Sequence, residues 1–175
     1  MSSFRWIIIV IALFSYGCKS SQEVSSTEPN KVQEQEPINL KPVLLASIQR
    51  TACYGQCPMY KTTYMNNGQV TYVGKRFVEK IGTYSALLDT DEINSIKEMV
   101  EEYNYFELDS LYPTPISDFP SCITEVQING KHKRVIDRRN PPEDLKSFEK
   151  FLDSLIEGKK LRKDSDSTVY TEHEQ

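Results

Sequence analysis

Two Asn-Gly dipeptides, at 67–68 and 129–130, constrain the fold of this chain more than any other feature. A two-residue type I′ turn needs positive φ at both central positions, and Asn followed by Gly adopts that conformation readily. Residues of high β propensity flank both dipeptides, which predicts two β-hairpins. A sheet that contains two hairpins is expected to be largely antiparallel, because tight turns join only antiparallel neighbours.

The hairpins also set a simple register for their strands. In the first hairpin Met65 would face Val70, and in the second Cys122 would face Asp137. The predicted strands cover residues 43–52, 58–66, 69–74, 77–88, 122–128 and 131–137.

Two amphipathic helices separate and follow these strands. The first begins near Asp89, whose spacing to Glu92 is typical of a capping box, although Thr90 could be the capping residue instead. The second follows Pro141-Pro142, and its acidic residues are expected to form a solvated face. Strands, helix, two strands and helix follow in that order without βαβ alternation. This order predicts an α+β fold: an antiparallel sheet of about five to six strands with both helices packed on one face.

The N-terminus resembles a bacterial lipoprotein signal. Arg5 precedes an apolar run over 6–14, about half of the roughly 20 residues that span a bilayer. The signal peptide is predicted over 1–17, and Cys18 would carry the lipid as the first mature residue. Ser15 departs from the usual leucine, so an ordinary secretory signal and an uncleaved anchor stay open. The signal predicts a membrane-anchored lipoprotein of the cell envelope, and Lys19 favours the outer membrane.

Composition divides the rest of the chain. Residues 18–41 are rich in Ser, Gln, Glu and Pro without a helical or strand period, which predicts a disordered, lipid-anchored tether. A single domain is expected over 42–160 and a disordered tail over 161–175. The net charge of −4 gives no footprint for nucleic acid or an anionic membrane, so the expected membrane contact is the lipid anchor.

The segment 50–60, RTACYGQCPMY, contains two cysteines four positions apart around a glycine. A thiol-redox site is disfavoured, because such enzymes place C-x-x-C at a helix N-terminus, whereas a strand follows here. A zinc site has suitable spacing at this pair but lacks further ligands, since only His132 lies in the domain. The favoured interpretation is a local disulfide that fixes the turn between two strands.

The same segment resembles the signature of the bacterial domain-of-unknown-function family 6438. The matching residues here are Arg50, Thr51, Cys53, Gly55, Cys57, Pro58 and Tyr60, and the similarity continues through 68–80 and at Gly82, Tyr84, Asp118, Pro120, Pro142 and Leu145. The resemblance implies a small exported domain, often lipid-anchored, and supplies no activity. Cys122 is outside the signature.

These arguments predict a Cys53–Cys57 disulfide with Cys122 as a free thiol. Pairing of Cys122 with either partner stays open, because a longer closed loop gives a larger entropic gain.

No catalytic motif is visible in the sequence, and we expect no catalytic site, metal or cofactor. Tyrosines on the strands are explained by β propensity, but a candidate binding surface would be formed by Tyr60, Tyr64, Tyr72 and Asp118. Two classes of function follow. The first is a non-enzymatic interaction module for an envelope protein or glycan. The second is an envelope enzyme, thiol-redox or hydrolase, with a site that no motif reveals.

Overall fold

The computed structural model describes residues 41–164. The predicted signal peptide, Cys18 and nearly all of the predicted tether lie outside the described residues, as does the chain from 165 onward. None of the helices within 41–164 is long and apolar enough to cross a membrane.

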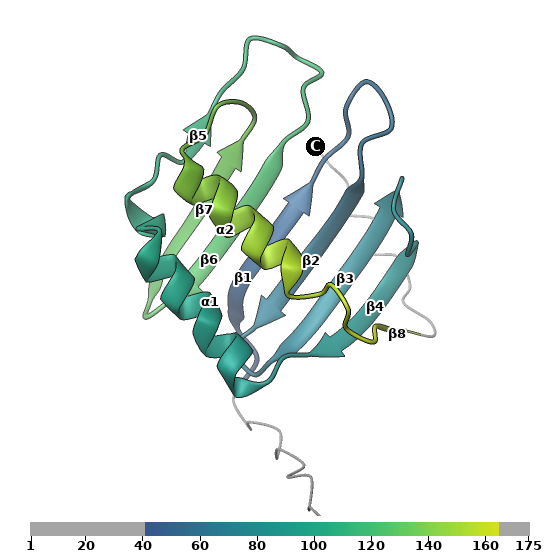
Figure 1. Cartoon of the computed structure of the whole chain (residues 1–175), viewed down its shortest axis with the longest axis vertical. Coiled ribbons are helices and arrows are strands. Elements are labelled where there is room, and N and C mark those ends of the chain that lie inside the picture. The colour runs from purple at the N-terminus through teal and green to yellow at the C-terminus, as the bar shows by residue number, and fades with distance from the viewer. Residues whose placement is uncertain (1–40, 165–175) are drawn as a thin grey trace, which may run out of the picture. The chain divides into compact units, whose positions relative to one another are not determined.

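An eight-stranded sheet forms the back layer of the domain (Figure 1). Its strands are β1 (Leu44–Arg50), β2 (Met59–Met65), β3 (Gln69–Arg76), β4 (Gly82–Leu87), β5 (Leu111–Tyr112), β6 (Cys122–Ile128), β7 (Lys131–Asp137) and β8 (Arg162–Lys163). Their spatial order is β5-β7-β6-β1-β2-β3-β4-β8.

The α+β class is confirmed, but the expected strand number and pure antiparallel pairing are wrong. The β5–β7 pair is parallel, so the sheet is mixed. The additional strands, β5 and β8, have two residues each and lie at the two edges, where no hydrophobic alternation can reveal them. Because β8 pairs with β4, the folded region extends beyond the expected limit at residue 160.

The hairpin of β6 and β7 has the predicted register. Asn129 and Gly130 have φ of 52° and 76°, as a type I′ turn requires. Cys122 therefore pairs with Asp137 at the far end of the two strands.

The register expected for the hairpin of β2 and β3 is wrong by one residue. Val70 pairs with Tyr64 rather than with Met65. In this turn Gly68 has a positive φ, 84°, and donates its N–H to the carbonyl of Met65 at 3.0 Å. Asn67 does not share the positive φ, so the connection is a longer turn closed by a left-handed glycine.

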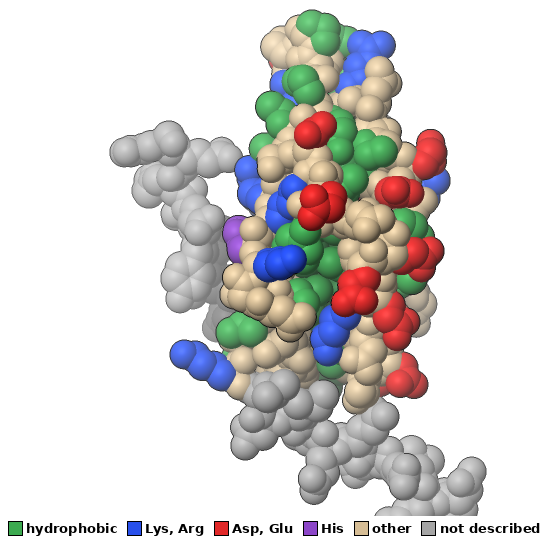
Figure 2. All heavy atoms as spheres, turned by 90° about the vertical axis from the view of Figure 1, so that its left-hand side faces the viewer, with side chains coloured by type: hydrophobic (Ala, Val, Ile, Leu, Met, Phe, Trp, Pro, Cys, Tyr) green, Lys and Arg blue, Asp and Glu red, His purple; other side chains and the backbone are tan. Residues whose placement is uncertain are grey.

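Both helices cross the same face of the sheet (Figure 1). Helix α1 spans Thr90–Glu102 and begins with the predicted capping box of Asp89 and Glu92. Helix α2 spans Glu143–Ser154, and a short 3-10 helix, η1, spans Tyr105–Glu107. Acidic side chains gather over this helix layer, on the right-hand side of Figure 2.

The core lies between the sheet and the two helices. The helices contribute their predicted apolar stripes, of which Ile93, Ile96, Val100, Leu145, Phe148 and Leu152 are buried. Residues that face the helices alternate along each strand with residues on the other face. Tyr64 belongs to the first set and is fully buried, and its hydroxyl donates to the carbonyl of Leu152 at 2.5 Å.

Candidate functional site

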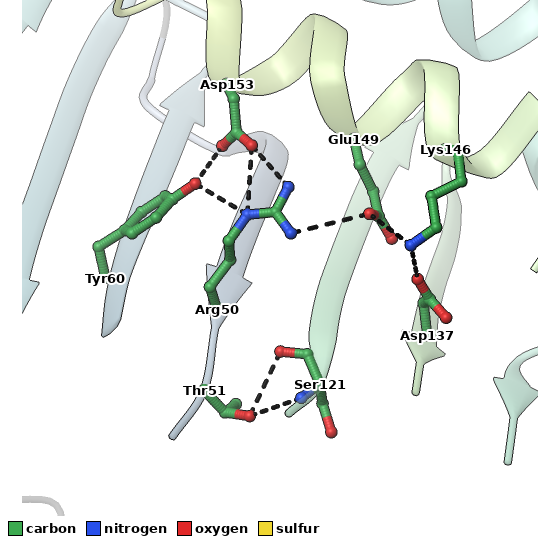
Figure 3. A network of polar contacts seen from close by, with 8 residues as sticks. All are labelled: Arg50, Thr51, Tyr60, Ser121, Asp137, Lys146, Glu149 and Asp153. Atoms are coloured by element: carbon green, nitrogen blue, oxygen red, sulfur yellow. Dashed lines mark hydrogen bonds and ion pairs between the residues drawn. The ribbon is translucent and has the colours of Figure 1, made fainter. Parts of the chain in front are cut away.

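Four helix-facing side chains form a polar row across one end of the sheet. Arg50 on β1 pairs with Tyr60 on β2 and with Cys122 on β6, and Cys122 pairs with Asp137 on β7. Side chains of directly opposed residues point to the same face, so these four lie side by side. Helix α2 passes over this polar row and supplies its other charged groups (Figure 3).

Asp153 on α2 binds Arg50 and Tyr60, which are the first and last residues of the 50–60 segment. Arg50 donates from Nη2 to Oδ2 of Asp153 at 2.6 Å and from Nε at 3.2 Å. The hydroxyl of Tyr60 donates to Oδ1 of Asp153 at 2.6 Å and accepts from Nε of Arg50 at 2.9 Å. One carboxylate therefore ties β1 and β2 to the last turn of the helix.

A second group of charges continues the network toward β7. Lys146 lies 2.5 Å from Oδ2 of Asp137 and 3.6 Å from Oε2 of Glu149. Glu149 is 2% exposed and lies 3.9 Å from Nη1 of Arg50. Oδ1 of Asp137 and Oε1 of Glu149 are buried without a hydrogen-bond partner among the described residues. Two buried carboxylates thus share the ammonium of Lys146.

Burial raises the pKa of Glu149 to about 7, although the positive charge of Lys146 opposes that rise. The repulsion of Asp137 acts in the same direction as burial. Burial, followed by the nearby Glu149, also raises the pKa of the Cys122 thiol. A buried thiol of raised pKa is a poor nucleophile.

The loop between β1 and β2 is held at both of its ends. The Cys53–Cys57 disulfide closes it with a Cα–Cα distance of 5.8 Å, as predicted, and Cys122 is free and buried. At its start, Thr51 donates its N–H to the carbonyl of Ser121 at 3.0 Å, and Ser121 donates its N–H to Thr51 Oγ1 at 2.8 Å. Tyr54, between the cysteines, is 94% exposed.

The candidate binding surface from the sequence is not assembled on the outside of the domain. Tyr64 is fully buried and Tyr72 is 6% exposed, because both face the helix layer. Tyr60 is half-buried and stacks on Tyr72 with ring centroids 5.7 Å apart. Asp118 is exposed, in the loop that leads to β6. The aromatic side chain that projects into solvent beside the signature is Tyr54.

Sequence reasoning missed the contribution of α2, whose acids were expected on a solvated face. A signal was present: Glu149 follows Leu145 by four positions and precedes Leu152 by three, within the apolar stripe. Asp153 follows Glu149 by one turn, on the same side of the helix. A carboxylate inside an apolar stripe predicts a cation partner, and here Lys146 at 3.6 Å and Arg50 at 3.9 Å are the cations next to Glu149.

The remaining candidates lie apart from the polar row. His132 is exposed and contacts Oε1 of Glu125 at 2.6 Å, on the face opposite Cys122. Within residues 41–164, no three His, Cys, Asp or Glu side chains lie close enough together to hold a metal ion. A shallow hollow of about 320 Å³ lies between α1, η1 and the β6–β7 turn, with Lys97, Phe106 and Asn129 among its lining residues.

The fold and this site define a small α+β domain in which a disulfide-closed loop is tied to an overlying helix by charged side chains. A family model described as a domain of unknown function (DUF6438) matches residues 45–156, and the chain belongs to that family. No curated protein matches the chain.

Proposed function

We propose that this chain is a cell-envelope lipoprotein whose domain acts as a non-enzymatic interaction module. The domain would be held at a membrane by lipid on Cys18 and would present the 51–58 loop to its partner. The observation that carries the proposal is that contacts hold this loop at its ends while its tip is exposed. The Cys53–Cys57 disulfide closes the loop, hydrogen bonds join Thr51 to Ser121, and Asp153 binds the flanking residues Arg50 and Tyr60. Tyr54 at the tip of the loop is 94% exposed.

Such a loop suits binding for a physical reason. A loop whose backbone is already held by a disulfide and hydrogen bonds loses less conformational entropy when its exposed side chain is buried against a partner. Tyrosine and tryptophan are the residues that most often anchor interfaces, because they combine a large apolar area with a polar tip. In this proposal the polar row positions the loop for binding and takes no part in catalysis.

The enzymatic alternative has less support from the geometry. A carboxyl with a pKa raised to about 7 is typical of active sites. Glu149 is only 2% exposed, however, because it is one of the buried residues of α2. The nearby thiol of Cys122 is likewise buried, so neither group is open to a substrate.

Membrane attachment is tested with Cys18→Ser in the full-length chain. We expect the variant to leave the membrane fraction or to accumulate unprocessed, whereas wild type fractionates with membranes. Identical fractionation and migration of the two forms would refute the lipid anchor.

The role of the loop is tested by a photo-crosslinking residue at position 54 in the lipidated chain. The control carries the same residue in place of Leu87, which is 69% exposed on β4 at the opposite end of the sheet. We expect adducts from position 54 and none from position 87. Equal labelling from both positions would contradict a binding role for the loop.

A further inference from the structure

Three loops meet at the end of the sheet where β1, β3 and β5 finish. They cover residues 51–58, 77–81 and 113–121, and together they are called the loop end here. The strand registers place all three at this end, and Figure 1 shows them along its upper and right-hand rim. The chain enters β1 at the opposite end.

The loop end carries most of the exposed large apolar side chains of the described residues. Of the eight such side chains, five belong to these three loops: Tyr54, Phe77, Ile81, Ile116 and Phe119. They come from three separate loops along this end of the sheet. Apolar side chains on separate loops can each enter the interfacial layer of a bilayer without a matching pocket.

Positive charge accompanies these apolar tips. The three loops themselves contain Lys80, Glu79 and Asp118, and four further cations lie next to them: Lys75, Arg76, Arg138 and Arg139. Glu143 and Asp144 follow Arg139 in the first turn of α2. Helix α1 has the opposite balance, with Asp91, Glu92, Glu98, Glu101 and Glu102 against Lys97. The upper end of Figure 2 correspondingly shows hydrophobic and Lys or Arg side chains, away from the acidic helix layer. Exposed cations therefore lie beside the apolar tips, although the net charge of the whole chain is −4.

Each loop is also held in shape before any partner binds. The disulfide closes the first loop. Nη2 of Arg138 donates to the carbonyls of Ile116 and Ser117 at 3.1 and 2.8 Å, and to that of Phe119 at 3.2 Å. The 77–81 loop packs its backbone at Lys80 so closely on Gly74 that a Cβ on Gly74 would lie 1.8 Å from the carbonyl oxygen of Lys80.

We infer that the loop end inserts its apolar tips into the surface of a membrane that contains anionic phospholipids. Apolar side chains enter the interface while the cations behind them meet the lipid phosphates, and both contributions strengthen peripheral binding. The inference rests on the proposed envelope location. A tether over 19–40 would reach on the order of 25 Å as a coil and about 70 Å when extended, so the loop end can meet the same membrane that holds the anchor.

The test uses the chain from Lys19 onward, which lacks the lipid. The core cluster lies within 45–156, so we expect the domain to fold in this form. Sedimentation is measured with vesicles of phosphatidylcholine plus about 30 mol% phosphatidylglycerol, and with phosphatidylcholine alone. We expect binding to the anionic vesicles that weakens as salt rises, and little binding to the neutral ones.

Variants separate the apolar and the electrostatic contributions. Arg76→Ser with Arg139→Ser should lower the partition coefficient by roughly fivefold for each cation removed. Tyr54→Ser with Phe119→Ser should lower it by about tenfold or more. The matched control Leu87→Ser removes an exposed leucine from the other end of the sheet and should change binding by less than about twofold.

Fluorescence gives a second readout that reduced stability would not mimic. Trp6 is the sole tryptophan of the sequence and is absent from this form, so Tyr54→Trp introduces a single reporter. Its emission should shift to shorter wavelength on anionic vesicles, whereas that of Leu87→Trp should not. Absence of vesicle binding, an unshifted Tyr54→Trp emission, or an equal loss in Leu87→Ser would each overturn the insertion. If Cys18→Ser still releases the full-length protein from membranes in that case, the envelope location stands without it.

Discussion

Arg50 and Asp153 are 103 positions apart in the sequence and join at 2.6 Å between Nη2 and Oδ2. This contact connects the end of β1 to the last turn of α2. It also places the guanidinium next to the hydroxyl of Tyr60, at the other side of the disulfide loop. The 50–60 segment is therefore stabilised by a residue that lies far outside it.

Removing the charge of Asp153 should loosen this connection. Asp153→Asn removes the carboxylate nearest to the half-buried Arg50 and leaves only Glu149, 3.9 Å away, so we expect a loss of about 1–3 kcal/mol in the free energy of unfolding. Urea denaturation measures it. Glu98→Gln on α1 is the matched control, because Glu98 is exposed and should change stability by less than about 0.5 kcal/mol. Equal effects of the two substitutions would show that the network adds nothing.

Glu149 should give the domain an unusual dependence on pH. Its pKa rises from 4.5 to about 7 on folding, so the folded state binds more protons than the unfolded state between those values. Stability is thus complete at lower pH, falls as pH rises through this window by at most about 3 kcal/mol, and levels off above it. Burial is the main cause of the raised pKa, because it disfavours the charged carboxylate of Glu149. Lys146 and Arg50 favour that charged form, whereas Asp137 disfavours it.

Glu149→Gln is neutral at every pH and should lack this decline. We expect the variant to be more stable than wild type near about pH 8 and similar to it near about pH 5, as measured by urea denaturation. Both proteins in this comparison keep Cys122 and Asp153, so Glu149 is the only titratable group that differs between them. An identical slope against pH in the two proteins would assign the titration to another group.

The disulfide should be local and should stabilise modestly. Non-reduced peptide mapping is expected to give one cross-linked peptide that contains Cys53 and Cys57, with Cys122 alkylated only after unfolding. Cys53→Ser with Cys57→Ser should cost about 2 kcal/mol, the chain-entropy value for so short a loop. Any cross-linked peptide that contains Cys122 would contradict this pairing.

Local signals predicted most of the fold. The capping box of Asp89 and Glu92, the apolar stripes of both helices and the register of β6 with β7 all follow from residues close together in the sequence. The register of β2 with β3 did not, because an Asn-Gly dipeptide fits turns of two lengths and only the backbone φ values distinguish them.

The candidate site was less predictable than the fold. The pairing of Cys122 with Asp137 places one end of the polar row, but nothing local indicates that Asp153 meets Arg50. That contact depends on the angle at which α2 crosses the sheet, which long-range packing determines. The same packing buries Tyr64 and Tyr72 and leaves Tyr54 exposed, although all three are tyrosines near strands.

The two turn glycines give a matched pair of substitutions. Gly68 and Gly130 both have positive φ, so an alanine at either position costs about 1 kcal/mol of backbone strain. A Cβ on Gly130 meets nothing within 4 Å, whereas a Cβ on Gly68 would lie 2.6 Å from the carbonyl oxygen of Leu88. That oxygen belongs to the backbone, and the N–H of Leu88 donates to the carbonyl of Gly68 at 2.8 Å, so the oxygen cannot move away freely.

We therefore expect Gly130→Ala to lose about 1 kcal/mol and Gly68→Ala roughly 3 kcal/mol or more in the free energy of unfolding, as measured by urea denaturation. Similar losses in the two variants would mean that the turn of β2 and β3 is not packed against the end of β4 as described.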